Sequence, residues 1–327
     1  MAGRAHHLVA SRVASPPTKF VKMNFDPTSL IAEEGLNASY ASIVRSWWLP
    51  LAEAIARRRG DERTDRGLVV GINGAQGNGK STLCRFLQVI LPAEFGLSTA
   101  TLSLDDLYLP HSERNHLGQT IHPLLATRGP PGTHDISLGL ATIEGAVAGR
   151  GTVLLPRFDK SRDDRCVRSD WDAIDAPVDV LLFEGWMVAA RPQPCKDLIR
   201  PVNVLEAKED PEGVWRQYAN ISLGTDYPAL FGKIDFLIAL IAPSFELVRS
   251  WRLLQEHKLR KRTGGGMSDP EIARFMQFYE RLTRHMLTEL PERAHISVEF
   301  DHSHNPVRIS PGCGSTPRRD PRLIATK

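Results

Sequence analysis

The chain has 327 residues, of which 42% are hydrophobic and 24% charged, with a formal net charge of +3 and a mean hydropathy of −0.24. These values are typical of a soluble globular protein with enough material for one large α/β domain or two ordinary ones. The slight net charge argues against a dedicated nucleic-acid binder, and no apolar run approaches the roughly 18 residues of a membrane span. We therefore expect neither nucleic acid nor a membrane as a partner, and the sequence leaves the oligomeric state open.

The two ends of the chain differ in composition from its middle. The first 25 residues contain no acidic residue and carry arginine, lysine and serine, which fits either an organellar transit peptide or a plain extension. We expect residues 1–37 to be a disordered extension, residues 38–309 to form the folded domain, and residues 310–327 to be a disordered tail. The four cysteines are widely scattered and form no C-x-x-C pair, which favours free thiols in a reducing compartment. The expected location is cytoplasmic, with an organelle as the alternative.

Strands and helices are predicted to alternate along most of the chain. Apolar residues at helical spacing predict a helix over 38–59, and short apolar runs from residue 67 onward are typical of buried parallel strands. The strands are predicted at 67–72, 98–104, 152–156, 178–185, 233–243 and 295–301, and the helices that follow the first of them at 81–91, 135–149, 244–262 and after 268. Residues 105–134, rich in proline, glycine and histidine, are expected to form a long functional loop. This alternation predicts an α/β fold with a mostly parallel sheet and helices on both faces.

The segment GINGAQGNGKST, residues 71–82, matches the phosphate-binding pattern G-x-x-x-x-G-K-[ST] between a predicted strand and a predicted helix. Its glycines let backbone N–H groups converge on phosphate oxygens, and the following helix points its N-terminus at the same anion. Lys80 would neutralise phosphate charge, and Ser81 would bind Mg²⁺. The residues expected to hold the nucleotide are Gly74, Ala75, Gln76, Gly77, Asn78, Gly79, Lys80, Ser81 and Thr82. The segment predicts a P-loop NTPase-type fold.

Carboxylates stand at the ends of two predicted strands. Glu184 ends the run VLLFE and is expected to hold Mg²⁺ or its waters, because this ion prefers oxygen ligands. Asp105 and Asp106 follow the run TLSL. One of them could accept the proton of an acceptor hydroxyl, while the other orients the acceptor or serves the metal.

The remaining motifs indicate a kinase among the P-loop proteins. The sequence has no N-K-x-D guanine motif and no L-S-G-G-Q signature, so we expect neither a GTPase nor an ABC-type ATPase. An arginine-rich helix followed by TGGGMSDPE indicates a hinged helical lid over about 243–288. Such a lid brings cations to the transferring phosphoryl group and excludes water. Arg252 is expected to contact the nucleotide, and Arg249, Arg260 and Arg262 are further lid candidates.

Five further segments carry a resemblance to a known family. They are LSLDDLYL (102–109), RGPPGTHD (128–135), LPRFDKS (155–161), LLFEGWMVA (181–189) and WRLLQEHKLRKRTGGGMSDPE (251–271). In this order they resemble the D-glycerate 3-kinase family, a relative of the uridine kinase, pantothenate kinase and phosphoribulokinase group. The resemblance runs from about Trp47 to Arg308 and implies transfer of the γ-phosphate of ATP to the 3-hydroxyl of D-glycerate, with Mg²⁺ as cofactor.

The resemblance also implies roles for individual residues. In the uridine kinase group an aspartate after the second strand acts as the base, and that position falls on Asp105. Tyr108 is retained, whereas Leu107 replaces the usual aromatic residue of that motif. Glu184 falls on the group's strand-end glutamate. The predicted catalytic residues are therefore Lys80, Asp105 and Glu184, and the predicted metal ligands are Ser81 and Glu184.

The acceptor site is expected among polar residues of the family-like loops. Glycerate is a small carboxylate with two hydroxyls, so its site needs a cation, and arginine can bind a carboxylate through two hydrogen bonds. The predicted acceptor-site residues are Asp106, Tyr108, Arg128, His134, Asp135, Arg157 and Lys160. The three cations are the carboxylate candidates. His134 and Asp135 are possible hydroxyl partners, although Asp135 could instead cap a helix.

Two alternatives to glycerate phosphorylation remain open from the sequence. One is a kinase acting on another small hydroxyl acceptor, such as a nucleoside or pantothenate. The other is a nucleotide-binding regulator that has lost catalysis. Without the resemblance, the sequence also does not distinguish transfer to the 3-hydroxyl from transfer to the 2-hydroxyl.

Overall fold

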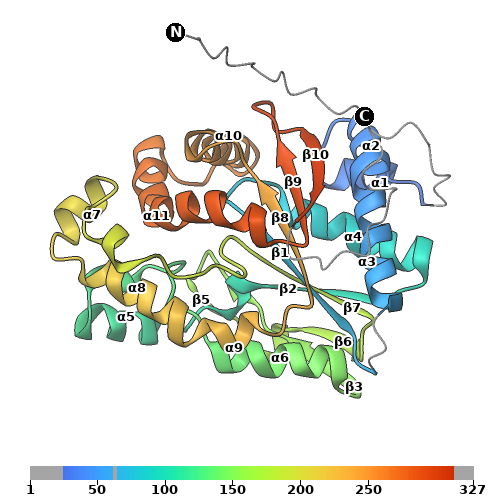
Figure 1. The fold of residues 1–327 in the computed structure, drawn as a ribbon, viewed down its shortest axis with the longest axis horizontal. Helices are drawn as coiled ribbons and strands as arrows, with labels where there is room; N and C mark the ends of the chain where they lie inside the picture. Colours follow the sequence, from blue (N-terminus) through green and yellow to red (C-terminus); the bar gives the residue numbers. More distant parts are fainter. Residues whose placement is uncertain (1–24, 62–64, 313–327) are drawn as a thin grey trace, which may run out of the picture.

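The computed structural model describes residues 25–61 and 65–312. A six-stranded sheet forms its centre (Figure 1), and the strands are β1 (Leu68–Gly74), β2 (Thr99–Ser103), β7 (Val180–Gly185), β8 (Phe236–Ile241), β9 (Ile296–Phe300) and β10 (Pro306–Pro311). Their order is β10–β9–β8–β1–β7–β2, and neighbours run parallel except for β10, which is antiparallel to β9. The predicted mostly parallel α/β sheet is thus confirmed.

The register of the central strands brings their carboxyl ends to one edge. Glu184 of β7 pairs with Ile72 of β1 on one side and with Ser103 of β2 on the other. The phosphate-binding loop follows β1 directly, and Asp105 follows β2 by two residues. Because the carboxyl ends of parallel strands form the usual binding edge of an open α/β sheet, the predicted site residues start close together.

Both faces of the sheet are buried, because alternate side chains of each strand enter two different cores. Val70 and Leu182 belong to one core, and Val69 and Leu181 to the other. The helices of the first core are α2 (Tyr40–Ile43), α3 (Leu49–Asp61), α4 (Lys80–Phe95) and α10 (Phe245–Thr263). Those of the second are α6 (Ile136–Ala148), α8 (Val214–Thr225), α9 (Tyr227–Phe231) and most of α11 (Asp269–Arg293), while α7 (Val204–Glu209) contributes Leu205.

The N-terminal part of the domain departs from expectation. The helix predicted over 38–59 is confirmed as continuous helical structure from Tyr40 to Asp61, in which a π-helical segment, Val44–Trp48, joins α2 to α3. Residues 25–37 are not disordered. They contain α1 (Thr28–Glu33), whose Leu30 and Ile31 are buried in the first core, and this apolar contact accounts for their order.

At the other end, β10 continues to Pro311, so Ser310 and Pro311, which were predicted to lie in the tail, instead pair with β9. The transit-peptide prediction for the first 25 residues falls, except for residue 25, outside the described residues, as does the tail from residue 313. No helix in the described ranges is long and apolar enough to cross a membrane.

The prediction of a structureless loop over 105–134 is wrong. This segment contains a 3₁₀ turn (Leu104–Leu107), α5 (His111–Thr120) and a second 3₁₀ turn (Pro123–Ala126). Arg114 of α5 is fully buried and donates to the carbonyl oxygens of Leu109, Ala126 and Asp163, at 3.1, 2.9 and 2.5 Å. A buried arginine that satisfies backbone acceptors holds the segment together without a large apolar core, and composition does not reveal such a residue.

Two small antiparallel pairs lie between α6 and β7. They are β3 (Gly151–Leu155) with β6 (Asp172–Ala176), and β4 (Phe158–Asp159) with β5 (Asp164–Arg165). The strand predicted at 152–156 therefore exists, but it belongs to a separate ribbon and not to the central sheet. The β4–β5 hairpin, residues 158–165, carries several residues of the candidate site.

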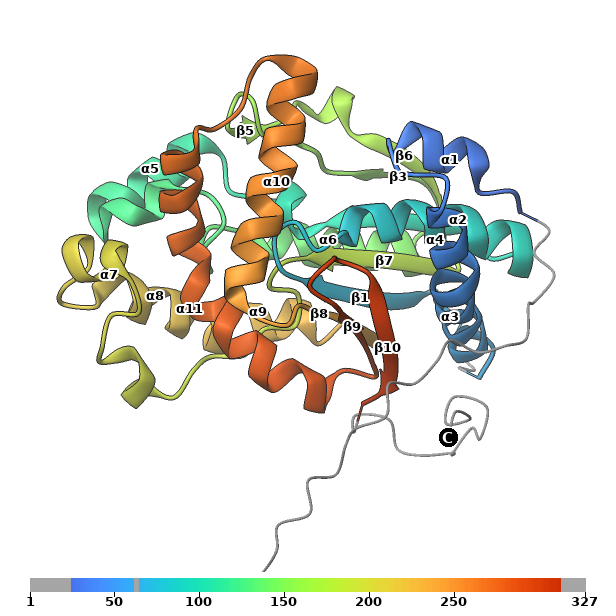
Figure 2. The ribbon, with the colours of Figure 1, turned by 90° about the horizontal axis from the view of Figure 1, so that it is seen from above.

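The predicted lid consists of α10 and α11, which lie side by side (Figure 2). Gly264, with a φ of 74°, ends α10 in the left-handed conformation that glycine adopts readily. Ser268 and Glu271 form a capping box at the start of α11. The break between the two helices thus falls within the segment TGGGMSDPE, where the sequence predicts it.

Candidate active site

The phosphate-binding loop follows β1 and leads into α4. Gly77 and Gly79 have φ angles of 75° and 82°, which L-residues other than glycine rarely adopt. Asn78 fixes the loop from the side, because its Nδ2 donates to the carbonyl oxygen of Leu240 on β8 at 2.7 Å. Gly79 immediately precedes α4, so the loop amides and the helix N-terminus face one anion-binding position.

Lys80 is the first residue of α4, and its Nζ donates to the carbonyl oxygen of Ala75 at 3.2 Å. Burial lowers its pKa, and the carboxylates of Glu184 and Asp105 act in the opposite direction. Gln76 is half-buried in the same loop. Thr82, predicted to contact the nucleotide, donates its hydroxyl to Glu34 Oε2 at 3.3 Å, which ties the loop to the N-terminal segment.

Ser81 and Glu184 come together at the edge of the sheet. Ser81 Oγ donates to Glu184 Oε1 at 3.1 Å, although the two residues are 103 positions apart. A hydroxyl and a carboxylate beside a phosphate-binding loop are the hard oxygen donors that suit Mg²⁺, which usually takes its other ligands from water and substrate phosphates. Within the described residues, no group of three or more His, Cys, Asp or Glu side chains could hold a metal alone. The donor set therefore fits a Mg²⁺ ion that arrives with phosphate.

Asp105 lies at the end of β2 and faces the same edge. Its carboxylate accepts from Tyr108 Oη at 2.7 Å and from Lys160 Nζ at 2.5 Å. Burial alone would raise its pKa, but the charge and hydrogen bond of Lys160 and the hydrogen bond of Tyr108 outweigh burial and lower the pKa to about 2. Asp105 is therefore a carboxylate at neutral pH and can accept a proton.

Asp106 points to a different partner. It accepts from Arg157 Nη1 at 2.8 Å and from the backbone N–H of Phe158 at 3.1 Å, and burial raises its pKa. Arg157 also donates to Asp172 through Nε and Nη2, at 2.9 and 2.5 Å. The guanidinium of Arg157 is thus shared between two carboxylates of the chain.

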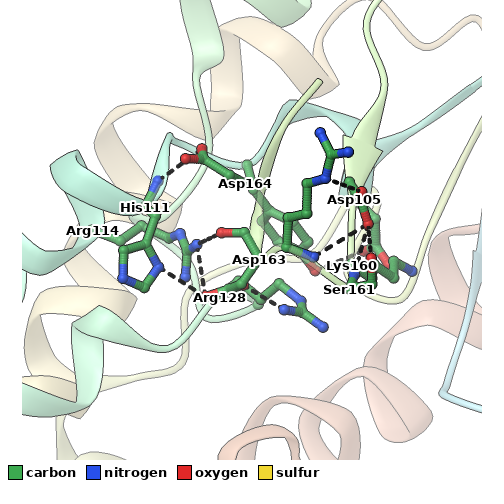
Figure 3. A network of polar contacts seen from close by, with 12 residues as sticks. Asp105, His111, Arg114, Arg128, Lys160, Ser161, Asp163 and Asp164 are labelled. Atoms are coloured by element: carbon green, nitrogen blue, oxygen red, sulfur yellow. Dashed lines mark hydrogen bonds and ion pairs between the residues drawn. The ribbon is translucent and has the colours of Figure 1, made fainter. Parts of the chain in front are cut away.

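Arg128 belongs to a second ionic cluster, shown in Figure 3. It forms an ion pair with Asp163. The Asp163 carboxylate also lies 3.0 Å from Arg114 Nη2 and 3.1 Å from His111 Nδ1. Asp163 has a φ of 55°, an uncommon value for a residue with a side chain. Figure 3 shows that the hairpin carrying Asp163 also carries Lys160, so one short segment contacts both Arg128 and Asp105.

His134 and Asp135 have partners within the chain. His134 Nδ1 lies 2.6 Å from Tyr227 Oη, and its ring packs on Tyr108 with centroids 4.7 Å apart. Burial lowers the pKa of His134 to about 3, so the ring is neutral. Asp135 accepts from the N–H of Leu138 as the cap of α6 and from Arg165 Nη2 at 3.1 Å. These contacts place His134 in the wall behind Tyr108. Both carboxylate oxygens of Asp135 already accept hydrogen bonds from the chain itself.

Helix α10 of the predicted lid approaches the phosphate-binding loop through its backbone. A Cβ added at Gly77 would lie 3.1 Å from the backbone N of Arg252. The Arg252 side chain bonds Glu256 at 2.5 Å and lies over the ring of Phe275, 5.6 Å from its centroid. Among the other predicted lid arginines, Arg260 pairs with Asp269, and Arg249 and Arg262 are exposed.

Tyr279 of α11 is a site residue that the sequence did not reveal. Its ring packs edge-on against Trp186, with centroids 4.8 Å apart, and its Oη is 3.4 Å from the carbonyl oxygen of Arg128. Its pKa is raised first by burial and then by the charge of Asp105. The pKa of Tyr108 likewise responds to both Asp105 and Arg128. Tyr108 thus contacts the carboxylate of Asp105, and Tyr279 approaches the backbone of Arg128. In sequence, Tyr279 is one apolar position of an amphipathic helix, a pattern that indicates only burial.

Comparison with known proteins agrees with this geometry. No protein-family model matches the chain. The uncharacterized kinase mug58 of Schizosaccharomyces pombe is 34% identical over 256 residues, which cover 74% of this chain and 91% of that protein. The chloroplastic D-glycerate 3-kinase of Arabidopsis thaliana is 31% identical over 258 residues, 73% of this chain, and the match spans only 54% of the plant protein.

Solved structures give the same result. A D-glycerate 3-kinase from Cryptococcus neoformans superposes with a TM-score of 0.67 and 27% identity, covering 81% of this chain and 96% of the other. The sequence matches exceed 30% identity, and the match to the S. pombe kinase extends over nearly all of that protein. The chain belongs to the P-loop kinase family that includes the D-glycerate 3-kinases.

Proposed function

We propose that the chain transfers the γ-phosphoryl group of ATP to the 3-hydroxyl of D-glycerate, giving 3-phosphoglycerate. The observation that carries this proposal is the acceptor end of the site, where Tyr108 bonds the carboxylate of Asp105 and Tyr279 approaches the backbone of Arg128. A small hydroxy acid has the matching chemistry. Its hydroxyl would face the carboxylate of Asp105, and its own carboxylate would bind the guanidinium of Arg128. The two relatives named as D-glycerate 3-kinases support the choice of acid.

The phosphate end would hold the nucleotide through backbone and one cation. The loop N–H groups and the start of α4 would bind phosphate oxygens, and Lys80 would neutralise their charge. Ser81 and Glu184 would hold Mg²⁺, which neutralises charge on the phosphates when bound. Arg252 and the rest of the lid would cover the phosphates and exclude water, which otherwise competes with the acceptor.

Asp105 would act as the general base. It is a carboxylate at neutral pH, and Tyr108 fixes one of its oxygens through a 2.7 Å hydrogen bond. The other oxygen accepts from Lys160 Nζ. The acceptor hydroxyl would give its proton to this carboxylate as its oxygen attacks the γ-phosphorus.

Arg128 is the preferred partner for the acceptor carboxylate. Arg157 already donates through all three nitrogens, to Asp106, Asp172 and the carbonyl oxygen of Pro156. In the described part of the chain, Arg128 bonds Asp163 through one nitrogen, and the two arginine side chains are equally exposed, at 29%. Arg128 could therefore bind a second carboxylate through two hydrogen bonds without breaking its existing pair, whereas Arg157 has only one N–H, on Nη2, without an acceptor among the described residues.

The proposal is tested by following purified protein with ATP, Mg²⁺ and D-glycerate by ³¹P and ¹³C NMR. We expect 3-phosphoglycerate to grow as ADP appears. Formation of 2-phosphoglycerate would keep the kinase and overturn the regiochemistry. ADP release only with a nucleoside or pantothenate would overturn D-glycerate as the acceptor. Binding of ATP with no turnover of any acceptor would indicate a nucleotide-binding regulator that has lost catalysis.

A further inference from the structure

Lys160 lies on the β4–β5 hairpin and contacts the proposed base, Asp105. Its Nζ is 2.5 Å from Asp105 Oδ2, yet 59% of its side chain is exposed. The charge of Glu184 contributes to raising the pKa of Lys160, and the charge of Lys160 contributes to lowering the pKa of Lys80. The Lys160 ammonium thus contacts Asp105 and lies within electrostatic range of Glu184 and Lys80.

The hairpin backbone is fixed on both sides of this lysine. Asp159 accepts from the N–H and the hydroxyl of Ser161, at 2.8 and 2.5 Å, and from the N–H of Arg162. Asp163, on the other side, is held by Arg114 and Arg128. Because the turn is anchored while the Lys160 side chain is exposed and has four carbons in its stem, the ammonium can move without the hairpin.

The contact with Asp105 cannot persist unchanged during phosphoryl transfer. A base is most effective when its pKa is near the working pH, and Lys160 is a principal reason why the pKa of Asp105 is low. The same oxygen that bonds Lys160 is the one that Tyr108 leaves open for the acceptor hydroxyl. Meanwhile, Lys160 is near enough for its charge to act on Lys80, the lysine of the phosphate-binding loop.

We propose that Lys160 is a catalytic cation, which leaves Asp105 for the transferring phosphoryl group once nucleotide and acceptor are both bound. The inference rests on the proposed kinase function of this site. The acceptor hydroxyl proton moves to Asp105, and the acceptor oxygen forms a bond to the γ-phosphorus. The bond from that phosphorus to the β–γ bridging oxygen breaks, and ADP leaves with the electron pair. Lys160 keeps its proton throughout and stabilises the charge on the equatorial phosphoryl oxygens.

This role differs from recognition of the acceptor carboxylate, the other task a lysine in this loop could have. A carboxylate-binding lysine would affect mainly the KM of the acceptor, since it contacts a group that does not change during the reaction. A phosphoryl-binding lysine stabilises charge that develops in the transition state, so its loss lowers kcat. The split between kcat and KM therefore separates the two roles.

The test compares Lys160→Met with Arg162→Met in the full chain. Arg162 is on the same hairpin, is 82% exposed and bonds only Asp159 among the described residues, so it is the matched control. We expect Lys160→Met to lower kcat about 10²- to 10³-fold, the usual cost of losing one group that stabilises transition-state charge. The KM values for ATP and acceptor should change less than about fivefold, and Arg162→Met should match the wild type.

A second measurement needs no turnover. Binding of ADP is measured with Mg²⁺ and acceptor, in the absence and in the presence of aluminium fluoride, a mimic of the transferring phosphoryl group. We expect Lys160→Met to bind ADP as the wild type does. It should lose most of the increase in ADP affinity that aluminium fluoride produces in the wild type. An unchanged or raised kcat together with an unchanged fluoride gain would overturn the role of Lys160. A wild type that gains affinity from fluoride but phosphorylates no D-glycerate would overturn the proposed acceptor instead.

Discussion

The two ends of the candidate site are built by different means. At the phosphate end, consecutive residues 74–82 supply the binding groups, and most of those groups are backbone amides. At the acceptor end, each carboxylate is paired with a cation far away in the sequence. Asp105 with Lys160, Asp106 with Arg157, Asp163 with Arg128 and Asp135 with Arg165 are separated by 55, 51, 35 and 30 residues.

This difference indicates which kinds of change each end tolerates. A backbone cradle does not depend on most side chains, so it fails when its geometry is altered. An assembly of ion pairs fails when one member is removed, because the remaining charge loses its partner. We therefore expect charge deletions to act at the acceptor end and small steric additions to act at the phosphate end.

The largest expected effect comes from Asp105→Asn. The amide cannot accept the hydroxyl proton, so kcat should fall about 10²-fold or more, while ATP affinity stays near that of the wild type. Steady-state kinetics and nucleotide titration measure the two quantities. Asp175→Asn, an exposed carboxylate of β6, is the matched control and should leave both unchanged. A rate for Asp105→Asn within a few-fold of the wild type would remove this residue from the role of base.

A smaller effect is expected from Arg128→Ala. A hydrogen bond to a charged group contributes about 1.5–3 kcal/mol, so the KM for an acidic acceptor should rise about 10- to 100-fold, while the KM for ATP changes little. Arg157→Ala is the comparison, and because its guanidinium already bonds both Asp106 and Asp172 we expect it to raise the acceptor KM less. The reverse order would move the carboxylate site toward Asp106.

The same contrast explains what the sequence could predict. The strand, glycine-rich loop and helix at 67–91 were predictable because each signal is local: an apolar run, a fixed spacing and a helix start. The juxtaposition of Ser81 and Glu184 followed from the rule that parallel strands share one binding edge. The fold class and the phosphate end could thus be read from the chain alone.

The acceptor end could be predicted only as a set of candidates. Asp105, Arg128 and Lys160 were recognisable as polar residues of family-like loops, but their pairing depends on α5 and the β4–β5 hairpin, which composition did not reveal. Arg114, which holds this region through buried hydrogen bonds, has no local signal that distinguishes it from a surface arginine. Tyr279 reaches the site only because α11 packs beside it, and helical periodicity reports burial without saying against what.

At the phosphate end, Gly77→Ala sharpens the comparison. Gly77 and Gly96 both have positive φ, 75° and 67°, but an added Cβ meets the Arg252 backbone at Gly77 and nothing within 4 Å at Gly96. Each alanine should cost about 1–2 kcal/mol of stability, because a side chain disfavours this conformation. Only Gly77→Ala should also weaken ATP binding, by about tenfold, since α10 must shift from the loop. Equal ATP affinity in the two variants would show that this contact does not position the nucleotide.

The smallest expected effect concerns His134, in the wall behind Tyr108. Burial lowers its pKa from 6.5 to about 3, so in the folded chain the ring stays neutral while in the unfolded chain it is protonated below pH 6.5. The unfolded state then binds more protons between pH 6.5 and pH 3, and the free energy of unfolding must fall as the pH is lowered through this window, by at most about 1.4 kcal/mol per pH unit.

His134→Gln removes this titration and leaves the others in place. The pKa values of His285, His295 and His304 are also lowered by burial, but these residues are common to both proteins, so the difference between the two isolates His134. Urea unfolding at pH 7 and pH 5 should give a smaller loss of stability for the variant than for the wild type, even if the variant is less stable at pH 7. Equal losses would mean that His134 is protonated in the folded chain, which would place a positive charge behind Tyr108 and leave Asp105 with a third cation in its surroundings.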